Sequence, residues 1–271
     1  MKKITIALLA LLLLTSTVFA AGSKEQAPGV DNSLQKVLDK GTLVLGLDDS
    51  FPPMGFRDEN NEIVGFDVDL AKEITKRMDV ELVLQPIDWN AKEQELNTGN
   101  IDCIWNGFTI TEDRLAAMTF TPAYVNNAQV VVVKSDAPYT SLASLANKKI
   151  GLQAGSSASE ALDNSPAFKA SIKSVVEFKE NLTGLMDLEI GGIDGLILDL
   201  LVANDNINRS GKDFRILDDH LTNEAYGVGF RKGEQKLADE VWSHMKAMDA
   251  DGSLAKIATK WFGADITVVG K

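Results

Sequence analysis

Residues 42–78 read TLVLGLDDSFPPMGFRDENNEIVGFDVDLAKEITKRM and set the pattern for the rest of the chain. They open with a short apolar run, Thr42–Leu47, of the kind found in strands that are covered on both faces. They close with Phe66–Met78, in which apolar residues recur every four positions and predict one face of a helix. Polar Asn60 and Asn61 stand between apolar flanks and predict a hairpin or tight turn. A buried strand followed by an amphipathic helix indicates an α/β fold.

The same alternation continues to the end of the chain. Further strands are predicted at residues 80–84, 101–105, 130–133, 149–153, 175–178, 195–198 and 228–230, and further helices at 33–40, 92–96, 142–146, 182–189, 235–249 and 253–261. Ser157 and Glu160 match a capping box, which predicts another helix start. Because a strand–helix unit restarts at residue 142, we expect two sheets rather than one, mostly parallel and flanked by helices. The last two helices lack strands of their own and could return to cover the first lobe.

The composition excludes several classes of protein. With 271 residues, 45% of them hydrophobic and 24% charged, the chain has an ordinary globular composition, so disorder is not expected. Its 27 basic and 39 acidic residues give a net charge of −12, which argues against a nucleic-acid binder. One cysteine and two histidines supply neither a disulfide nor a usual set of zinc ligands. We therefore expect no metal site, no cofactor and no nucleic-acid partner.

The N-terminus carries a targeting signal. Residues 1–20 read MKKITIALLALLLLTSTVFA, with two lysines, an apolar core and small residues before a cleavage point after Ala20, which is the pattern of a secretory signal peptide. An uncleaved anchor helix is the alternative, although the apolar core is short for a membrane span. Residues 21–32 are small and polar and are expected to form a flexible leader. The mature protein is expected to be soluble and to lie outside the cytoplasm, in the periplasm or cell envelope.

Polar and aromatic residues follow several of the predicted strands, where open α/β sheets bind their ligands. Taken singly, Asp48 could cap a turn, Asp199 could cap a helix, and Arg114 could be a solvated helix residue. Phe51 and Trp89 could be core aromatics. Taken together with the helix start at Gly155–Ser157, whose free amides beside an arginine form a receptor for a carboxylate, they also offer an acceptor for an ammonium group and an aromatic slot. Those three features match the chemistry of a free α-amino acid.

Further stretches make the chain resemble a known family. They are GNIDCIWNGFTITEDRLAAMTFTPAY at 99–124, KKIGLQAGSSASEAL at 148–162, GGIDGLILD at 191–199 and WFG at 261–263. Together with residues 45–74, they resemble the solute-binding proteins of polar amino-acid ABC importers, over essentially residues 34–263. The FDVDL run and the later G-x-T-I-T-x-x-R pattern carry this resemblance most specifically.

The resemblance implies a two-lobed α/β fold of the periplasmic-binding-protein (Venus-flytrap) type, with mixed sheets flanked by helices and two strands crossing as the hinge. It implies that residues 33–125 and 226–271 form lobe 1 and that residues 126–225 form lobe 2. It also implies the substrate-binding component of an ABC importer, which binds its ligand between the lobes and delivers it to a membrane permease. On this basis we expect a monomer that is not an enzyme.

The resemblance also implies roles for individual residues. Arg114 is expected to pair bidentately with the ligand α-carboxylate, and the backbone amides of Thr109 and Ser157 are expected to complete that subsite. Asp199 is expected to take the α-ammonium group, helped by the Gly107 carbonyl and the Thr109 hydroxyl.

The remaining roles concern the ligand side chain. Phe51 and Trp89 are expected to form aromatic walls around it, and Asp48 is expected to contact its distal polar end. Weaker candidates for the pocket lining are Asn106, Gln153, Ser156 and Leu198. A carboxylate between aromatic faces suits a guanidinium or ammonium group, so arginine or lysine is the first choice of ligand and glutamine or cystine the second.

Two other functions remain open. A cyclohexadienyl-dehydratase-like enzyme would use the same fold with a catalytic carboxylate in the cleft, but the predicted cleft positions contain no acid without a binding role. A ligand-binding partner of a sensory receptor would share the site and differ in its membrane partner. Turnover of prephenate would identify the enzyme, and gene neighbourhood would identify the receptor partner.

Overall fold

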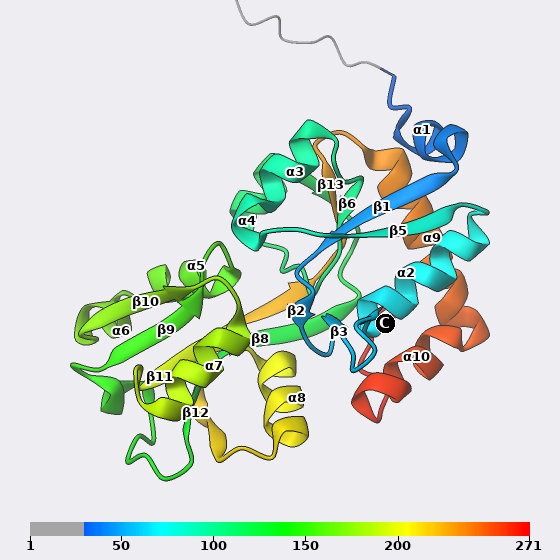
Figure 1. Cartoon of the computed structure of the whole chain (residues 1–271). Coiled ribbons are helices and arrows are strands. Elements are labelled where there is room, and N and C mark those ends of the chain that lie inside the picture. Colours follow the sequence, from blue (N-terminus) through cyan, green and yellow to red (C-terminus); the bar gives the residue numbers. More distant parts are fainter. Residues whose placement is uncertain (1–29) are drawn as a thin grey trace, which may run out of the picture. The chain divides into compact units, whose positions relative to one another are not determined.

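The structure, a computed structural model, describes residues 30–271. The predicted signal peptide and most of the predicted leader therefore lie outside the described residues. Within the described part of the chain, none of the helices has the length and apolar character that crossing a membrane requires. Helices and strands alternate through two five-stranded sheets and one small three-stranded sheet (Figure 1).

The first sheet has the strand order β5-β1-β6-β13-β7. Its strands are β1 (Thr42–Leu47), β5 (Glu81–Pro86), β6 (Cys103–Ile104), β7 (Met118–Phe120) and β13 (Gly229–Arg231). Strand β1 is parallel to β5 and β6, whereas β13 is antiparallel to β6 and β7. The helices grouped with this sheet are α1 (Ser33–Lys40), α2 (Phe66–Arg77), α3 (Lys92–Thr98), α4 (Glu112–Ala117), α9 (Gln235–Asp251) and α10 (Ser253–Phe262). We call this group the first lobe.

A small antiparallel sheet follows β1 in sequence. It consists of β2 (Ser50–Phe51), β3 (Gly55–Arg57) and β4 (Ile63–Val64). The hairpin predicted at Asn60 and Asn61 is the β3–β4 connection, where Asn61 takes a positive φ of 65° and its N–H donates to the Asp58 carbonyl. The hairpin predicted from Asn60 and Asn61 is therefore confirmed.

The second sheet has the strand order β10-β9-β11-β8-β12. Its strands are β8 (Val125–Lys134), β9 (Lys149–Gln153), β10 (Ser174–Phe178), β11 (Gly195–Asp199) and β12 (Phe214–Tyr226). Strand β9 is parallel to β10 and β11, whereas β8 is antiparallel to β11 and β12. The helices grouped with it are α5 (Ser157–Asp163), α6 (Pro166–Ser171), α7 (Asn181–Ile190) and α8 (Leu200–Ser210). We call this group the second lobe.

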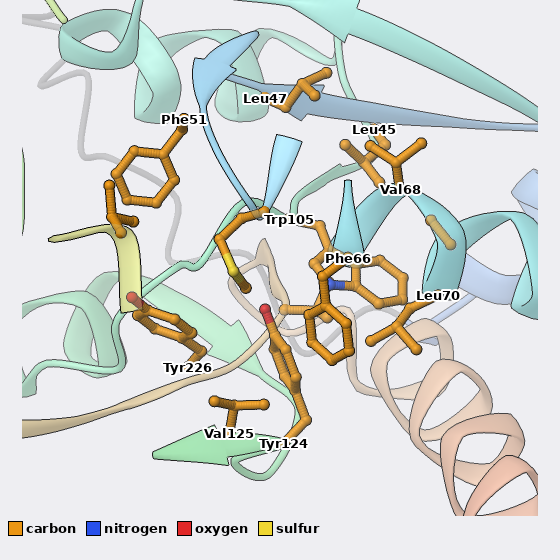
Figure 2. Close-up of a cluster of buried hydrophobic side chains, with 14 of the residues drawn as sticks. Leu45, Leu47, Phe51, Phe66, Val68, Leu70, Trp105, Tyr124, Val125 and Tyr226 are labelled. Atoms are coloured by element: carbon orange, nitrogen blue, oxygen red, sulfur yellow. The ribbon is translucent and has the colours of Figure 1, made fainter. Parts of the chain in front are cut away.

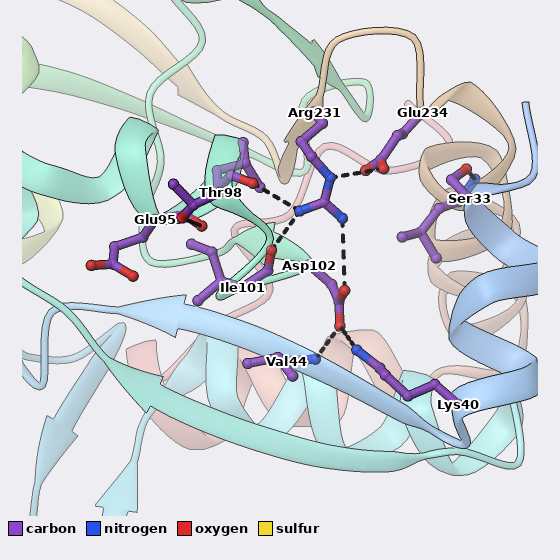
Figure 3. Close-up of polar contacts among 11 residues, drawn as sticks. Ser33, Lys40, Val44, Glu95, Thr98, Ile101, Asp102, Arg231 and Glu234 are labelled. Atoms are coloured by element: carbon purple, nitrogen blue, oxygen red, sulfur yellow. Dashed lines mark hydrogen bonds and ion pairs between the residues drawn. The ribbon is translucent and has the colours of Figure 1, made fainter. Parts of the chain in front are cut away.

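The C-terminal segment returns to the first lobe, as the strandless helices predicted. Strand β13 lies between β6 and β7, and a polar network fastens it there (Figure 3). Arg231 Nη1 donates to the Ile101 carbonyl at 2.6 Å, and Arg231 Nη2 lies 3.7 Å from Asp102 Oδ1. The other oxygen of Asp102 accepts from Lys40 Nζ at 2.6 Å and from the Val44 N–H at 2.8 Å. Asp102 thereby links Arg231 of the last strand, β13, to Val44 of the first strand, β1.

Strands β8 and β12 pair with each other and connect the two lobes, and we call them the crossing strands. Their pairing runs to Val125 opposite Tyr226, where the chain passes between the sheets. At this point the fully buried rings of Tyr124 and Tyr226 lie 6.4 Å apart, and Phe66 and Trp105 pack beside Tyr124 (Figure 2). The expected two-lobed α/β fold with mixed sheets is confirmed. The lobe limits given above, 33–125 with 226–271 and 126–225, stay a prediction.

Some expectations about local structure need correction. The capping box at Ser157 and Glu160 is absent, because Ser156 is the N-cap of α5 and makes no side-chain capping bond. Strand β12 and helix α8 were not predicted. In β12 the ladder is irregular between Ile216 and Thr222, so its side chains do not alternate cleanly between apolar and polar. A strand without that alternation gives little signal in sequence.

Candidate functional site

All eleven of the predicted site residues line one small cavity. The first lobe and the small sheet contribute Asp48, Phe51, Trp89, Asn106, Gly107, Thr109 and Arg114, and the second lobe contributes Gln153, Ser156, Ser157 and Asp199. Most of them follow the carboxyl end of a strand, which is where the argument from open α/β sheets placed them. Leu198 is the exception among the weaker candidates, because it lies in the hydrophobic core and is not among the lining residues.

Arg114 is a buried cation that lines the cavity. It lies on α4 and is 8% exposed, its Nη1 donates to the Thr109 carbonyl at 2.8 Å, and its guanidinium lies 4.4 Å from the centre of the Phe108 ring. None of the ion pairs among residues 30–271 involves Arg114. A buried guanidinium with donors to spare is suited to receive a carboxylate bidentately.

Ser157 lines the same cavity from the second lobe and, like Arg114, contacts Thr109. As the first residue of α5, its N–H has no acceptor inside the helix and can donate to an anion. Its hydroxyl donates to Thr109 Oγ1 at 3.1 Å, which links the two lobes directly. The Ser157 hydroxyl was expected to cap a helix, but it forms a hydrogen bond between the two lobes instead.

Asp199 is a buried carboxylate at the end of β11. It precedes α8 but makes no capping bond to that helix. Its Oδ1 instead accepts from Asn127 Nδ2 at 2.7 Å and from Tyr226 Oη at 2.8 Å, both on the crossing strands. Burial raises the pKa of Asp199, and the nearby charge of Glu224 raises it further. A carboxylate held in this way is stabilised by any cation that enters the cavity.

Asp48 is a second buried carboxylate in the same cavity. Its Oδ1 accepts from the Ser50 N–H at 2.9 Å, and its Oδ2 accepts from Gln153 Nε2 at 2.7 Å across the lobes. Burial raises its pKa to about 6, partly offset by these hydrogen bonds, and the charges of Glu180 and Asp49 raise it further. Asp48 therefore stays mostly ionised at pH 7 without a cationic partner in the described chain.

Gln153 and the polar side chains around it hold Asp48 in position. The side-chain Oε1 of Gln153 accepts from Asn181 Nδ2 at 3.0 Å, which turns the Gln153 amide N–H₂ toward Asp48. Ser156 Oγ donates to the Gln153 carbonyl at 2.8 Å, and Asn106 Oδ1 accepts from the Asp48 N–H at 3.1 Å. These side chains line the cavity, but their hydrogen bonds are directed mainly to the protein itself.

Two aromatic side chains give the cavity apolar walls. Phe51 and Trp89 are 6% and 7% exposed, so each keeps a small accessible face. Trp89 stands edge-to-face on Phe108, with ring centres 5.7 Å apart. Gly107 has a positive φ of 53°, and a Cβ there would lie 3.0 Å from Phe51 Cε1, so only glycine lets this ring approach the backbone.

Asp67, from the FDVDL run, fixes the Gly107 turn. It is fully buried, and its Oδ2 accepts from the Gly107 N–H at 2.6 Å while its Oδ1 accepts from Tyr124 Oη at 2.8 Å. Burial raises the pKa of Asp67 to about 7, against the opposing effect of those hydrogen bonds. This residue supports the site without lining it.

Sequence reasoning missed several residues around the cavity. Glu224 on β12 accepts from Thr109 Oγ1 at 3.0 Å, and Asn127 and Gln129 on β8 donate to it as well. Lys92, on α3, donates to the Gly155 carbonyl across the lobes at 2.7 Å. A polar residue next to a run of valines was a usable signal for Gln129, whereas nothing in the sequence marked Glu224.

Two lobes joined by crossing strands, with a small cavity lined by buried unpaired charges from both, define a solute-binding protein. The chain belongs to the bacterial extracellular solute-binding proteins, family 3, whose family model matches residues 43–264. This confirms the family resemblance found in the sequence.

Two curated relatives match over nearly the whole chain. The L-cystine-binding protein TcyJ of Escherichia coli (strain K12) is 29% identical over 260 residues, which are 95% of this chain and 96% of that protein. ABC transporter arginine-binding protein 1 of the same strain is 28% identical over 268 residues, which are 97% of this chain and 99% of that protein.

Three solved structures share the fold. Tv2483 bound to L-arginine has a TM-score of 0.85 at 32% identity, covering 89% of this chain and 98% of that one. An ABC uptake transporter substrate-binding protein from Streptococcus pneumoniae with bound histidine has a TM-score of 0.86 at 33% identity, covering 88% and 99%. The ancestral amino acid-binding protein AncCDT-1, a precursor of cyclohexadienyl dehydratase, has a TM-score of 0.78 at 29% identity, covering 85% and 99%.

Proposed function

We propose that this protein binds a free amino acid with a cationic side chain, L-arginine first and L-lysine second, and delivers it to the permease of an ABC importer. The observation that carries the proposal is the set of three buried, unpaired charges on one cavity, namely Arg114, Asp199 and Asp48. A basic amino acid supplies one counter-charge to each through its carboxylate, its α-ammonium and its side chain. The relatives' ligands, which include arginine, histidine and cystine, support an amino acid in general.

The order of the binding steps follows from which lobe carries each ligand-binding group. The ligand first meets Arg114, Thr109 and the aromatic walls on the first lobe. The second lobe then brings Asp199 and the Ser157 N–H onto the same ligand. Ligand contacts with both lobes favour the closed state, and this difference in affinity drives closure. The closed protein, a monomer outside the cytoplasm, presents a surface spanning both lobes to the permease.

We propose a binding protein rather than an enzyme, since each buried charge that lines the cavity has a role in holding an amino acid. The sequence led us to expect no acid in the cleft without a role in ligand binding. The structure changes this expectation, because Glu224 lies beside the cavity and has no predicted ligand contact. AncCDT-1 shows that the fold also leads to dehydratases. A prephenate turnover assay therefore belongs with the ligand tests, and measurable turnover would contradict the proposal.

The function is tested by thermal unfolding of the ligand-stripped protein with each of the twenty amino acids, cystine and ornithine. A ligand present at a hundred times its dissociation constant adds about 2.7 kcal/mol to the free energy of unfolding. For a chain of this size that raises the Tm by roughly 5–10 °C. We expect the largest shifts with arginine and lysine. A larger shift with glutamine, histidine or cystine would keep the function and change the ligand, and no shift with any compound would refute both.

The role of Asp48 is tested by Asp48→Asn. Removing this charge takes away the counter-charge for a cationic side chain, and a hydrogen bond to a charged group contributes about 1.5–3 kcal/mol. We expect arginine affinity to fall roughly 10- to 150-fold while glutamine affinity changes little, measured by calorimetry. Asp49→Asn is the matched control, because Asp49 pairs with Arg57 at the surface. Equal losses for arginine and glutamine would show that Asp48 is not the specificity determinant.

A further inference from the structure

We propose that Glu224 is a positioning residue of the ammonium subsite, where it holds the Thr109 hydroxyl and places a second negative charge beside Asp199. This inference rests on the proposed function, because it concerns how the ligand's ammonium group is received. It extends that function by assigning a role to a residue of the crossing strand β12 that does not line the cavity itself.

One oxygen of Glu224 gathers donors from both lobes and from a crossing strand. Its Oε2 accepts from Thr109 Oγ1 at 3.0 Å, from Gln129 Nε2 at 3.1 Å and from Asn127 Nδ2 at 3.2 Å. Ser157 Oγ lies 3.5 Å from the same oxygen. Thr109 belongs to the first lobe, Ser157 to the second, and the two amides to β8. The surroundings of the Glu224 carboxylate therefore depend on contacts with both lobes.

These contacts set the direction of the Thr109 hydroxyl. A hydroxyl has one hydrogen and two lone pairs, and the Thr109 hydrogen is directed to Glu224. One lone pair accepts from Ser157 Oγ at 3.1 Å. The remaining lone pair is left to accept an N–H from the ligand. Without Glu224, the Thr109 hydroxyl could turn and offer its hydrogen to the ammonium group, which has no acceptor for it.

Glu224 and Asp199 form a pair of carboxylates, and no basic side chain among residues 30–271 makes an ion pair with either. A single side-chain amide, Asn127 Nδ2, donates to both, at 2.7 Å to Asp199 Oδ1 and at 3.2 Å to Glu224 Oε2. A ligand ammonium arriving beside Asp199 therefore relieves the repulsion between two negative charges.

The charged groups around this pair come from several elements. Arg114 acts on Glu224 and Asp199 from α4, and Tyr226 of β12 donates to Asp199. The other charged residues that share a surface hollow with Glu224 are Glu112, Asp113, Glu160 and Asp163. Arg114 is thus the cation that acts on the pair from within the described chain, and it is the residue proposed to hold the ligand carboxylate.

This arrangement predicts a pH dependence with a definite sign. Asp199 must be ionised to receive the ammonium group, and Glu224 raises its pKa. As the pH falls through that raised pKa, a growing fraction of the free protein carries a proton on Asp199, and ligand affinity falls. Glu224→Gln removes the charge, lowers the pKa of Asp199 and moves the part of this fall that is due to Asp199 to lower pH. The part due to Asp48, whose pKa is about 6, is common to the wild type and the variant and cancels in the ratio of their affinities.

The experiment measures L-arginine affinity by calorimetry from pH 5 to 8.5 for the wild type, Glu224→Gln and Glu224→Asp. At pH 8 we expect Glu224→Gln to bind roughly three- to tenfold more weakly, because a charged hydrogen bond to Thr109 becomes a neutral one. Toward pH 5 this ratio should shrink to one or reverse. Glu224→Asp keeps the charge but withdraws it from Thr109, so it should bind more weakly at every pH with the wild-type profile. Glu177→Gln, an exposed acid on β10, should match the wild type throughout.

A second readout needs no ligand. The carboxyl carbon of Asp199, followed by NMR in the ligand-free protein, should titrate at lower pH in Glu224→Gln than in the wild type. Parallel affinity profiles, or an unchanged Asp199 midpoint, would overturn the role of Glu224. If the wild type binds no amino acid, the proposed function fails, and the NMR midpoint still decides whether Glu224 and Asp199 are coupled.

Discussion

Arg114→Ala is expected to fold and to lose nearly all affinity for L-arginine. Removing one partner of a buried charge pair costs about 3–5 kcal/mol, because the other charge stays buried without compensation. That corresponds to a roughly 150- to 5,000-fold rise in Kd, measured by calorimetry. The stranded group would be the ligand's α-carboxylate, facing the position where the Arg114 guanidinium now lies between Thr109 and the Phe108 ring.

Two companion variants make this result specific. Arg114→Lys keeps the charge but cannot bind a carboxylate bidentately, so an intermediate loss is expected. Arg57→Ala removes a half-exposed arginine paired with Asp49 at the surface and should leave affinity unchanged. Near-wild-type affinity in a folded Arg114→Ala protein would show that the carboxylate subsite lies elsewhere.

Among the substitutions proposed here, Asp67→Ala is expected to lower the stability of the fold most. The substitution leaves the Gly107 N–H and the Tyr124 hydroxyl buried without their acceptor, and each such group costs about 1–3 kcal/mol. We expect the free energy of unfolding to fall by about 2–6 kcal/mol, and the Tm by roughly 5–20 °C in a thermal unfolding scan. Because Gly107 adjoins Phe51 in the cavity, ligand affinity should fall as well.

Asp67→Asn separates hydrogen bonding from packing. Its amide oxygen can still accept from the Gly107 N–H, so the loss of stability should be clearly smaller than in Asp67→Ala. Glu62→Ala, an exposed acid in the same lobe, should leave the Tm unchanged. A Tm for Asp67→Ala equal to that of the wild type would mean that Tyr124 and Gly107 find other partners.

Much of the fold could be predicted because its signals are local. The apolar run of β1 and the four-residue spacing of α2 are each readable within a few residues. The residues that line the cavity could be predicted for a related reason. Residues such as Asp48 and Asp199 directly follow strands, and strand ends of one sheet meet at a common edge. The resemblance to the family then supplied roles that the residue types alone left open.

What could not be predicted depends on contacts between distant segments. Glu224 lies in a polar strand with an irregular ladder, and its partner Thr109 comes more than a hundred residues earlier. Ser157 matched a capping box, but its hydroxyl bonds across the lobes instead. The FDVDL motif marked Asp67 without showing that it holds the Gly107 turn. Side-chain hydrogen bonds of this kind are decided by tertiary structure rather than by local pattern.

The placement of β13 has a consequence for the order in which the chain can fold. All five strands of the second sheet lie between residues 125 and 226, so that sheet can be complete once residue 226 has been made. Strand β7 pairs in the first sheet only with β13, which is not made until residue 231. The lobe that begins first in the chain therefore finishes last. Until β13 is present, the β6 edge of the first sheet and strand β7 both lack the strand that pairs with them.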